Sequence, residues 1–169
     1  MRILIFFIFL ITNSYAIESA DIKNLIIHKD TKKYESVTFL DAKNDEFMLR
    51  DFQGNLILLN FWATWCAPCK EEMPSLDLLQ VNKNFDNLKI IPINVGKDNT
   101  EKVQDFFKDL KIKNLVNYFD SNITLAKKFG LRGIPTSILI NKEGDEFARI
   151  VGSIDFMDKK FIEWLSDYD

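Results

Sequence analysis

The fold is decided by the stretch Asn60-Phe61-Trp62-Ala63-Thr64-Trp65-Cys66-Ala67-Pro68-Cys69. An apolar run from Leu56 to Trp62 leads into it, and continuous runs of this length are typical of strands buried on both faces of a parallel or mixed sheet. The spacing of apolar residues then indicates a helix from Glu71 to about Phe85, with Pro74 inside it. The only two cysteines of the 169 residues therefore lie in a tight turn between a buried strand and a helix.

A second apolar run, from Leu88 to Val95, completes a strand–helix–strand unit. Two strands joined in this way are expected to be parallel, with a right-handed crossover. The other expected elements are a β-hairpin over 37–49, a helical turn over 49–54, a helix after Asn99-Thr100, a strand at 116–119, a helix at 120–129, a hairpin of strands 136–140 and 146–151, and a C-terminal helix at about 155–165. The sequence thus predicts one α/β domain with a central sheet.

The N-terminus has the pattern of a signal peptide over residues 1–16. Arg2 supplies a positive charge, an apolar run from Ile3 to Ile11 follows, and Ser14-Tyr15-Ala16 places small residues where a signal peptidase cuts. A helix of this run would rise only about 14 Å, which is too short for a bilayer core of roughly 30 Å. A buried core helix and an uncleaved anchor are the alternatives. We expect an exported, periplasmic protein that is soluble after cleavage.

After removal of the signal peptide, the chain is expected to consist of two parts. Residues 17–34 are polar and mixed, and they are expected to form a loosely held leader before a folded domain at 35–169. His28, the only histidine, lies in this leader and is expected to have no role. The net charge is −3, and the lysines are scattered among acids rather than collected in a basic tract, so no nucleic-acid partner is expected.

The cysteine pair is best interpreted as a redox-active dithiol. In an oxidising compartment most disulfides are structural, but a bridge between residues three apart closes a very short loop and stabilises the fold by only about 2 kcal/mol. A structural zinc site needs four ligands and a catalytic one three, and the chain offers no further cysteine and one distant histidine. We therefore expect dithiol–disulfide exchange, with no metal and no cofactor.

The position of the turn assigns a role to each cysteine. Backbone N–H groups at the start of a helix and the helix dipole favour a thiolate, which is the nucleophile in disulfide exchange. Cys66 is therefore expected to be the attacking, partly exposed thiol. Cys69, one turn further along the helix, is expected to be shielded and to resolve the mixed disulfide that Cys66 forms with a substrate.

The stretch from Phe61 to Pro74 resembles the active-site segment of the thioredoxin superfamily and, within it, the exported TlpA/ResA-like thiol-disulfide oxidoreductases. A second motif, Gly133-Ile134-Pro135-Thr136, resembles the cis-proline loop of this family, and the likeness covers about residues 35–167. The resemblance implies a thioredoxin-like three-layer fold. This fold has a central mixed β-sheet flanked by helices, an N-terminal β-hairpin and a central helix–strand insertion at about 96–119.

The resemblance also implies a substrate surface around the cysteines. The Ile134–Pro135 bond is expected to be cis, to pack against the disulfide and to leave the Ile134 backbone free for a substrate strand. The alternative is a trans proline that only begins an edge strand. Trp65 is expected to lie on an exposed apolar rim, while Ala67 and Pro68 stiffen the turn and contact substrate, and Trp62 belongs to the core.

Two positions separate this chain from cytoplasmic thioredoxins. Those proteins carry a buried aspartate six residues before the first cysteine, where this chain has Asn60, and an amide cannot deprotonate the resolving thiol. In the TlpA/ResA-like group a glutamate three residues after the second cysteine is thought to do so, and Glu72 occupies that position. Burial would raise the pKa of such a carboxyl group and suit it to exchange the proton of Cys69. The alternative is that Glu71 and Glu72 are surface residues of the first helical turn.

The predicted function is an exported reductase of protein disulfides that contributes to cell redox homeostasis. The resemblance implies substrates such as the haem-binding cysteines of apocytochrome c or the cysteines of copper-site assembly proteins, with electrons from a membrane-bound thiol reductase. We expect a monomer. A disulfide-forming oxidase, a thiol peroxidase and a non-enzymatic binding or chaperone module are the alternatives, although the peroxidase would need a threonine and an arginine beside its cysteine.

Overall fold

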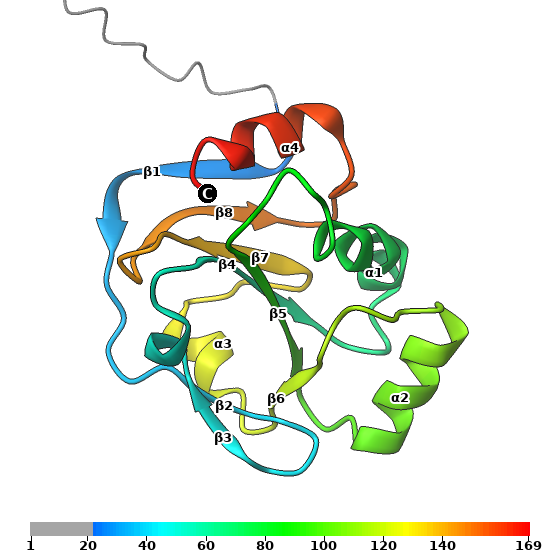
Figure 1. The fold of residues 1–169 in the computed structure, drawn as a ribbon. Helices are drawn as coiled ribbons and strands as arrows, with labels where there is room; N and C mark the ends of the chain where they lie inside the picture. Colours follow the sequence, from blue (N-terminus) through cyan, green and yellow to red (C-terminus); the bar gives the residue numbers. More distant parts are fainter. Residues whose placement is uncertain (1–21) are drawn as a thin grey trace, which may run out of the picture.

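Residues 22–169 are described by a computed structural model of the chain, and the predicted signal peptide at 1–16 lies outside them. In the described part, eight strands form one sheet in the order β1-β8-β7-β4-β5-β6-β2-β3 (Figure 1). The strands are β1 (Leu25–Lys32), β2 (Thr38–Leu40), β3 (Glu46–Met48), β4 (Leu56–Trp62), β5 (Leu88–Val95), β6 (Tyr118–Asp120), β7 (Thr136–Ile140) and β8 (Glu146–Val151). The helices are the 3₁₀ helix η1 (Leu49–Phe52) and the α-helices α1 (Ala67–Leu79), α2 (Thr100–Asp109), α3 (Thr124–Lys128) and α4 (Lys159–Ser166). No helix of this range has both the length and the hydrophobicity that crossing a membrane requires.

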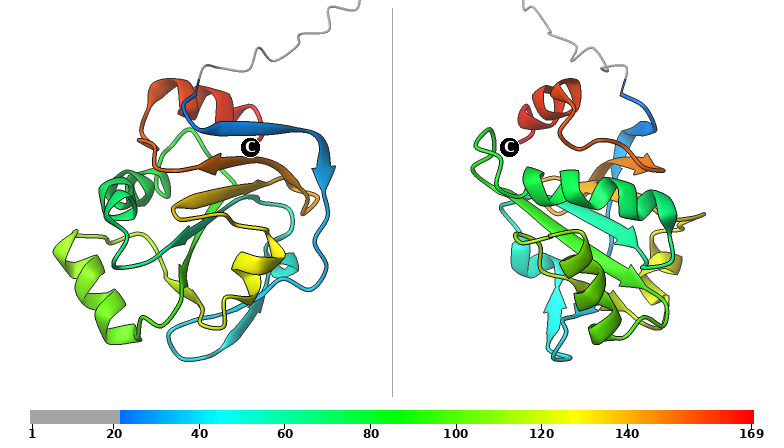
Figure 2. Two further views of the ribbon diagram at one scale, coloured as in Figure 1. Left: turned by 180° about the vertical axis from the view of Figure 1, so that it is seen from behind. Right: turned by 90° about the vertical axis from the view of Figure 1, so that its right-hand side faces the viewer.

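The sheet is mixed around its central strand. β5 runs parallel to β4 on one side, and β7 runs antiparallel to it on the other. Every residue of β4 is buried, because helices cover both faces of the sheet. α1, α2 and α4 pack on one face, and α3 packs on the other, where Phe39 of β2 belongs to the same cluster of buried residues (Figure 2). This is the three-layer fold with hairpin and α2–β6 insertion that the sequence predicts, so the predicted fold class is confirmed.

The first residues of α1 and α4 differ from those predicted from the apolar pattern, because residues at the helix N-terminus determine where each helix begins. α1 begins at Ala67 rather than Glu71, because Pro68 needs no N–H partner in the first turn of a helix, and it ends at Leu79. α4 begins at Lys159, after Asp158, whose side chain accepts the N–H of Phe161 at 3.1 Å. The earlier start of α1 places both cysteines at the helix end itself.

Residues 25–32, expected in a loosely held leader, form the edge strand β1. Leu25 to Ile27 pair antiparallel with Ile150 to Ala148 of β8. Most of β1 is exposed, so its residues lack the alternating apolar pattern on which a strand prediction depends. The prediction of a leader is therefore wrong for this segment, which backbone pairing holds in the sheet.

His28, expected to have no role, contacts the buried carboxylate of Glu146. Its Nε2 lies 2.5 Å from Oε1 of Glu146, and the hydroxyl of Tyr34 donates to Oε2 at 2.6 Å. Arg149 donates to the same carboxylate from Nε at 2.7 Å and from Nη2 at 2.9 Å. We call these four residues the Glu146 cluster. The side chain of Glu146 is 0% exposed, and its contact with His28 links β8 to β1.

Candidate active site

β4 ends at Trp62, and the turn that follows it carries Cys66, while Cys69 lies in the first turn of α1. Cys66 and Cys69 form a disulfide, and their Cα atoms are 5.3 Å apart. The exposed fraction is 6% for Cys66 and 0% for Cys69. Cys66 is thus the more accessible of the two, but in this disulfide form it belongs to the buried core cluster and is less exposed than the sequence suggests.

The first turn of α1 directs N–H groups at Cys66, which is the N-cap residue of the helix. Its Sγ accepts the N–H of Cys69 at 3.3 Å, and its carbonyl accepts the N–H of Lys70 at 3.1 Å. N–H groups and the helix dipole at this end favour a negative charge on the capping side chain. The geometry therefore stabilises a thiolate at Cys66 when the disulfide is reduced.

Glu72 lies in the core, with 2% of its surface exposed, whereas its neighbour Glu71 is exposed. It is the third residue after Cys69 on α1, so the two side chains share a helix face. Nδ2 of Asn60 donates to Oε1 of Glu72 at 2.8 Å and to Oγ of Ser137 at 3.0 Å. Burial raises the pKa of Glu72 to about 7, and the hydrogen bond from Asn60 opposes this rise only in part. A carboxyl group with this pKa binds and releases a proton at neutral pH.

The second motif lies at the same end of the sheet as the cysteine turn. Thr136 of β7 is paired with Phe61 of β4, so the loop that precedes β7 reaches the edge from which the turn emerges. The Ile134–Pro135 peptide bond is cis, and Ile134 packs against the core cluster that contains both cysteines. Oγ1 of Thr136 donates to the carbonyl of Gly133 at 2.8 Å and closes the loop.

Exposed residues surround the turn on its outer side. The exposed fraction of Trp65 is 69%, and Ala67 and Pro68 are exposed as well. Trp62 is fully buried, and its Nε1 donates to Oδ1 of Asn117 at 3.0 Å. The site residues that the sequence singles out all belong to the segments that meet here, and they are Cys66, Cys69, Glu72, Trp65, Ala67, Pro68, Ile134 and Pro135.

Asp98 was not predicted from the sequence, yet it holds the backbone just before the cysteines. Its Oδ2 accepts the N–H of Thr64 at 2.9 Å and Nδ2 of Asn94 at 3.1 Å, while Oδ1 accepts Nζ of Lys102 at 2.6 Å. Burial alone would raise the pKa of Asp98, but the hydrogen bonds from these donors lower it to about 2. The sequence signal that could have identified Asp98 is its position just after the predicted strand 88–95. Residues that follow neighbouring parallel strands lie at the same edge of a sheet.

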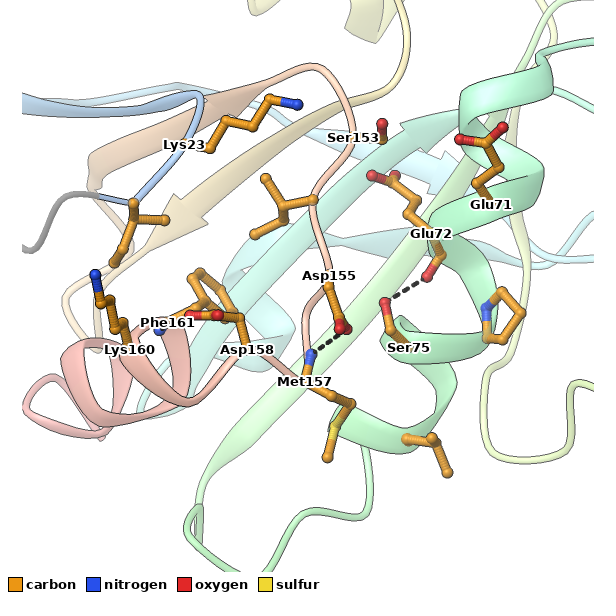
Figure 3. Close-up of a pocket in the computed structure, with 14 residues that line it drawn as sticks. Lys23, Glu71, Glu72, Ser75, Ser153, Asp155, Met157, Asp158, Lys160 and Phe161 are labelled. Carbon is orange, nitrogen blue, oxygen red and sulfur yellow. Dashed lines mark hydrogen bonds between the residues drawn. The ribbon is translucent and has the colours of Figure 1, made fainter.

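A cavity of about 840 Å³ opens beside Glu72 (Figure 3). α1 forms one wall with Glu71, Glu72 and Ser75, and the segment 153–158 after β8 forms the opposite wall. Figure 3 shows Glu72 and Ser153 on the facing walls. Glu72 therefore lines a space large enough to hold water.

The chain is similar in sequence to a known protein family and to several known proteins. A family model described as Redoxin matches residues 29–158. The thiol-disulfide oxidoreductase ResA of Bacillus thuringiensis subsp. konkukian is 35% identical over 124 residues, which are 69% of this chain and 65% of the relative. ResA of Bacillus anthracis is 32% identical over 141 residues, which are 79% of this chain and 74% of that relative. The chain thus spans just under two thirds of the length of the first of these relatives.

Solved structures of similar fold include StoA of Bacillus subtilis, which is 27% identical with a TM-score of 0.63 and covers 76% of this chain and 96% of its own. A secreted thiol-disulfide isomerase from Corynebacterium glutamicum, 22% identical, has a TM-score of 0.72 over 88% of this chain and 95% of the other, and it shows the likeness of fold. These matches confirm the resemblance seen in the two motifs. The chain belongs to the Redoxin family, has a thioredoxin-like fold and is a relative of the ResA thiol-disulfide oxidoreductases.

Proposed function

We propose that this protein is an exported thiol-disulfide oxidoreductase that reduces disulfides of other proteins. The observation that carries the proposal is the Cys66–Cys69 pair at the N-terminus of α1, with the buried Glu72 behind it and the exposed ring of Trp65 in front. The relatives support the same type of reaction, because they are named thiol-disulfide oxidoreductases.

The reaction begins with the pair in its reduced form. The Cys66 thiolate attacks one sulfur of a substrate disulfide, so that a mixed disulfide forms and the other substrate sulfur leaves as a thiolate. Cys69 then loses its proton and attacks Sγ of Cys66, which restores the Cys66–Cys69 disulfide and releases the second substrate thiolate. The substrate gains two electrons, and a dithiol of another protein returns two electrons to this one.

Glu72 is the proposed base of the second step. Its side chain shares a helix face with Cys69, and a carboxyl group with a pKa of about 7 accepts a thiol proton at neutral pH. The cavity beside Glu72 then gives that proton a path to solvent that does not pass through the docked substrate. Asn60 orients the carboxyl group through the hydrogen bond to Oε1.

The proposed substrates are exported proteins with a disulfide to be reduced. The family resemblance supports two classes, namely the haem-binding cysteines of apocytochrome c and the cysteines of copper-site assembly proteins. A membrane-bound thiol reductase is the proposed electron donor, and the protein is proposed to act as a monomer. The signal-peptide pattern at 1–16 supports a location outside the cytoplasm.

Trapping of mixed disulfides tests the proposal in the full-length protein. Cys69→Ser removes the resolving thiol, so covalent adducts with substrate proteins are expected to accumulate, to dissolve in reductant and to be identifiable by mass spectrometry. Cys66→Ser is the matched control and is expected to form no adduct. The proposal is overturned if Cys69→Ser forms no adduct or if Cys66→Ser fully rescues a deletion strain.

The equilibrium of the pair with glutathione tests the direction of the reaction. A reductase requires a pair that reduces its substrates, so the pair is expected to exchange with glutathione and to become a dithiol only in strongly reducing glutathione buffers. A strongly oxidising equilibrium would favour the disulfide-forming oxidase instead.

A further inference from the structure

Asp98 connects the cysteine turn to the insertion α2. It accepts the N–H of Thr64, two residues before Cys66, and it forms an ion pair with Lys102 of α2. The side chain of Asp98 is 3% exposed, whereas that of Lys102 is 55% exposed. The negative charge is therefore buried beside the turn, and the positive charge that balances it lies largely in water.

We propose that Asp98 is a positioning residue of the cysteine pair: it fixes the backbone before Cys66 and, together with Lys102, sets how readily the Cys66–Cys69 disulfide is reduced. The inference rests on the proposed redox function. It concerns the equilibrium between the disulfide and the dithiol, and it adds no new chemical step.

The charge of Asp98 lies close enough to act on Cys66. Its Oδ2 is 2.9 Å from the nitrogen of Thr64, and two Cα steps of about 3.8 Å each separate Thr64 from Cys66. Asp98 is 9% and Cys66 is 6% exposed, so water screens their interaction less than it does at an open surface. A fixed negative charge here disfavours the Cys66 thiolate, which exists only in the reduced protein, and therefore favours the disulfide.

Lys102 acts in the opposite direction. Its ammonium group partly cancels the charge of Asp98, so removing it exposes Cys66 to the full effect of the carboxylate. Asp98 stays ionised in that case, because Thr64 and Asn94 still donate hydrogen bonds to it. The charged residues of the first turns of α1 are the same in every variant below, and they are Lys70, Glu71 and Glu72.

The test compares Asp98→Asn with Lys102→Gln in the full-length protein. One measurement is the fraction of disulfide in glutathione buffers of graded composition, and the other is the pH at which Cys66 ionises, from the ultraviolet absorbance of its thiolate. For Asp98→Asn we expect a shift of about threefold toward the dithiol and ionisation at lower pH. For Lys102→Gln we expect a shift of about twofold toward the disulfide, because Lys102 is more exposed. The asparagine keeps an oxygen for the N–H of Thr64, so this variant removes the charge and preserves the position.

Asp77 provides a matched control. It is another buried carboxylate, and it accepts the backbone N–H groups of Lys113, Asn114 and Leu115. It lies about 12 Å further along α1 than Cys69. Asp77→Asn is expected to lower stability and to leave the glutathione equilibrium unchanged.

Shifts of opposite sign are diagnostic, because both substitutions break the same ion pair. If Asp98 served only the fold, both variants would lose stability, and the equilibrium would stay unchanged or move in one direction for both; either result overturns the inference. A wild-type pair that does not exchange with glutathione at all would instead overturn the proposed function. If Asp98→Asn does not fold, Lys102→Gln decides alone, and an unchanged equilibrium in that variant overturns the inference.

Discussion

Glu72 and Glu146 are both buried carboxyl groups of one domain, yet their pKa values move in opposite directions. Burial raises both, but hydrogen bonds from Arg149, Tyr34 and His28 bring the pKa of Glu146 below its ordinary value. Glu72 has the Asn60 amide as its side-chain partner and no charged one, and its pKa rises to about 7. The number and charge of the donors, rather than the depth of burial, therefore decide whether a buried acid holds structure or exchanges a proton.

Glu146→Ala is expected to have the largest effect. It leaves the guanidinium of Arg149 beside the emptied site without its carboxylate, and the free energy of unfolding should fall by about 3–5 kcal/mol in urea denaturation. Glu143→Ala changes an exposed acid of the same hairpin and should alter that free energy by less than about 0.5 kcal/mol. A loss below about 1 kcal/mol for Glu146→Ala would mean that the ion pair of Glu146 contributes no more to stability than an ordinary surface pair.

The pH dependence of stability should have opposite signs for the two acids. Between the ordinary pKa of 4.5 and the folded value of about 7, folded Glu72 holds a proton that the unfolded chain has lost. Its stabilising contribution is therefore complete below the ordinary value and disappears as the pH rises to about 7, a change of roughly 3 kcal/mol. For Glu146, with a lowered pKa, the contribution is complete at higher pH and is lost as the pH falls through the folded pKa.

Glu72→Gln tests the first of these slopes, because glutamine does not titrate. Unfolding free energies measured near pH 5 and near pH 8 should differ less in the variant than in the wild type by about this amount. Equal differences in the two proteins would show that Glu72 ionises in the fold as it does in water.

Glu72→Gln should also slow the resolving step about 100-fold at neutral pH, because Cys69 loses its proposed base. Single-turnover kinetics with a mixed disulfide on Cys66 measure this step apart from the initial attack, which should change little. Glu71→Gln, on the exposed face of the same turn, is the control. A resolving rate equal to that of the wild type would exclude Glu72 as the base.

Asn60→Asp should shift the proton exchange of Glu72 to higher pH. The substitution places a second carboxyl group within hydrogen-bond distance of Oε1, and two acids that share a site raise one pKa, here by about one unit or more. The pH midpoint of the resolving rate measures the shift. Ser137→Ala removes only the neutral neighbour of Asn60 and should leave the midpoint in place, while an unmoved midpoint in Asn60→Asp would contradict the coupling.

Tyr34→Phe is expected to have the smallest effect, a loss of about 1 kcal/mol in the free energy of unfolding. It removes one hydrogen bond to Glu146 and keeps the ring contact with Phe129, whose centroid lies 4.4 Å away. The remaining donors still hold the carboxylate. A loss as large as that of Glu146→Ala would mean that the cluster acts as one indivisible unit.

The centre of the fold could be predicted because its signals are local. The apolar run of β4 and the two motifs each specify their structure within a few residues, and the strands 136–140 and 146–151 were predicted with the bounds of β7 and β8. Glu71 and Glu72 show the limit of prediction from local signals. They are identical in type, and only the phase of α1 decides that one faces solvent and the other the core.

The rest depends on contacts between distant segments. Glu146 follows Asp145 after a turn, so it reads as a polar hairpin residue, and its burial requires β1 to cover β8. β1 itself is largely exposed and lacks the apolar pattern of a strand. Asp98 gains its role from Thr64, which only the sheet brings near.

The pairing of the first strand with the last has a consequence for the order in which the protein folds. Asn24, just before β1, donates to the carbonyl of Ser153, which is 129 positions away along the chain. Contacts between such distant segments form slowly, and they require almost the entire chain to be present. A partly synthesised chain therefore has β1 without its neighbour, so the sheet is completed only at the end.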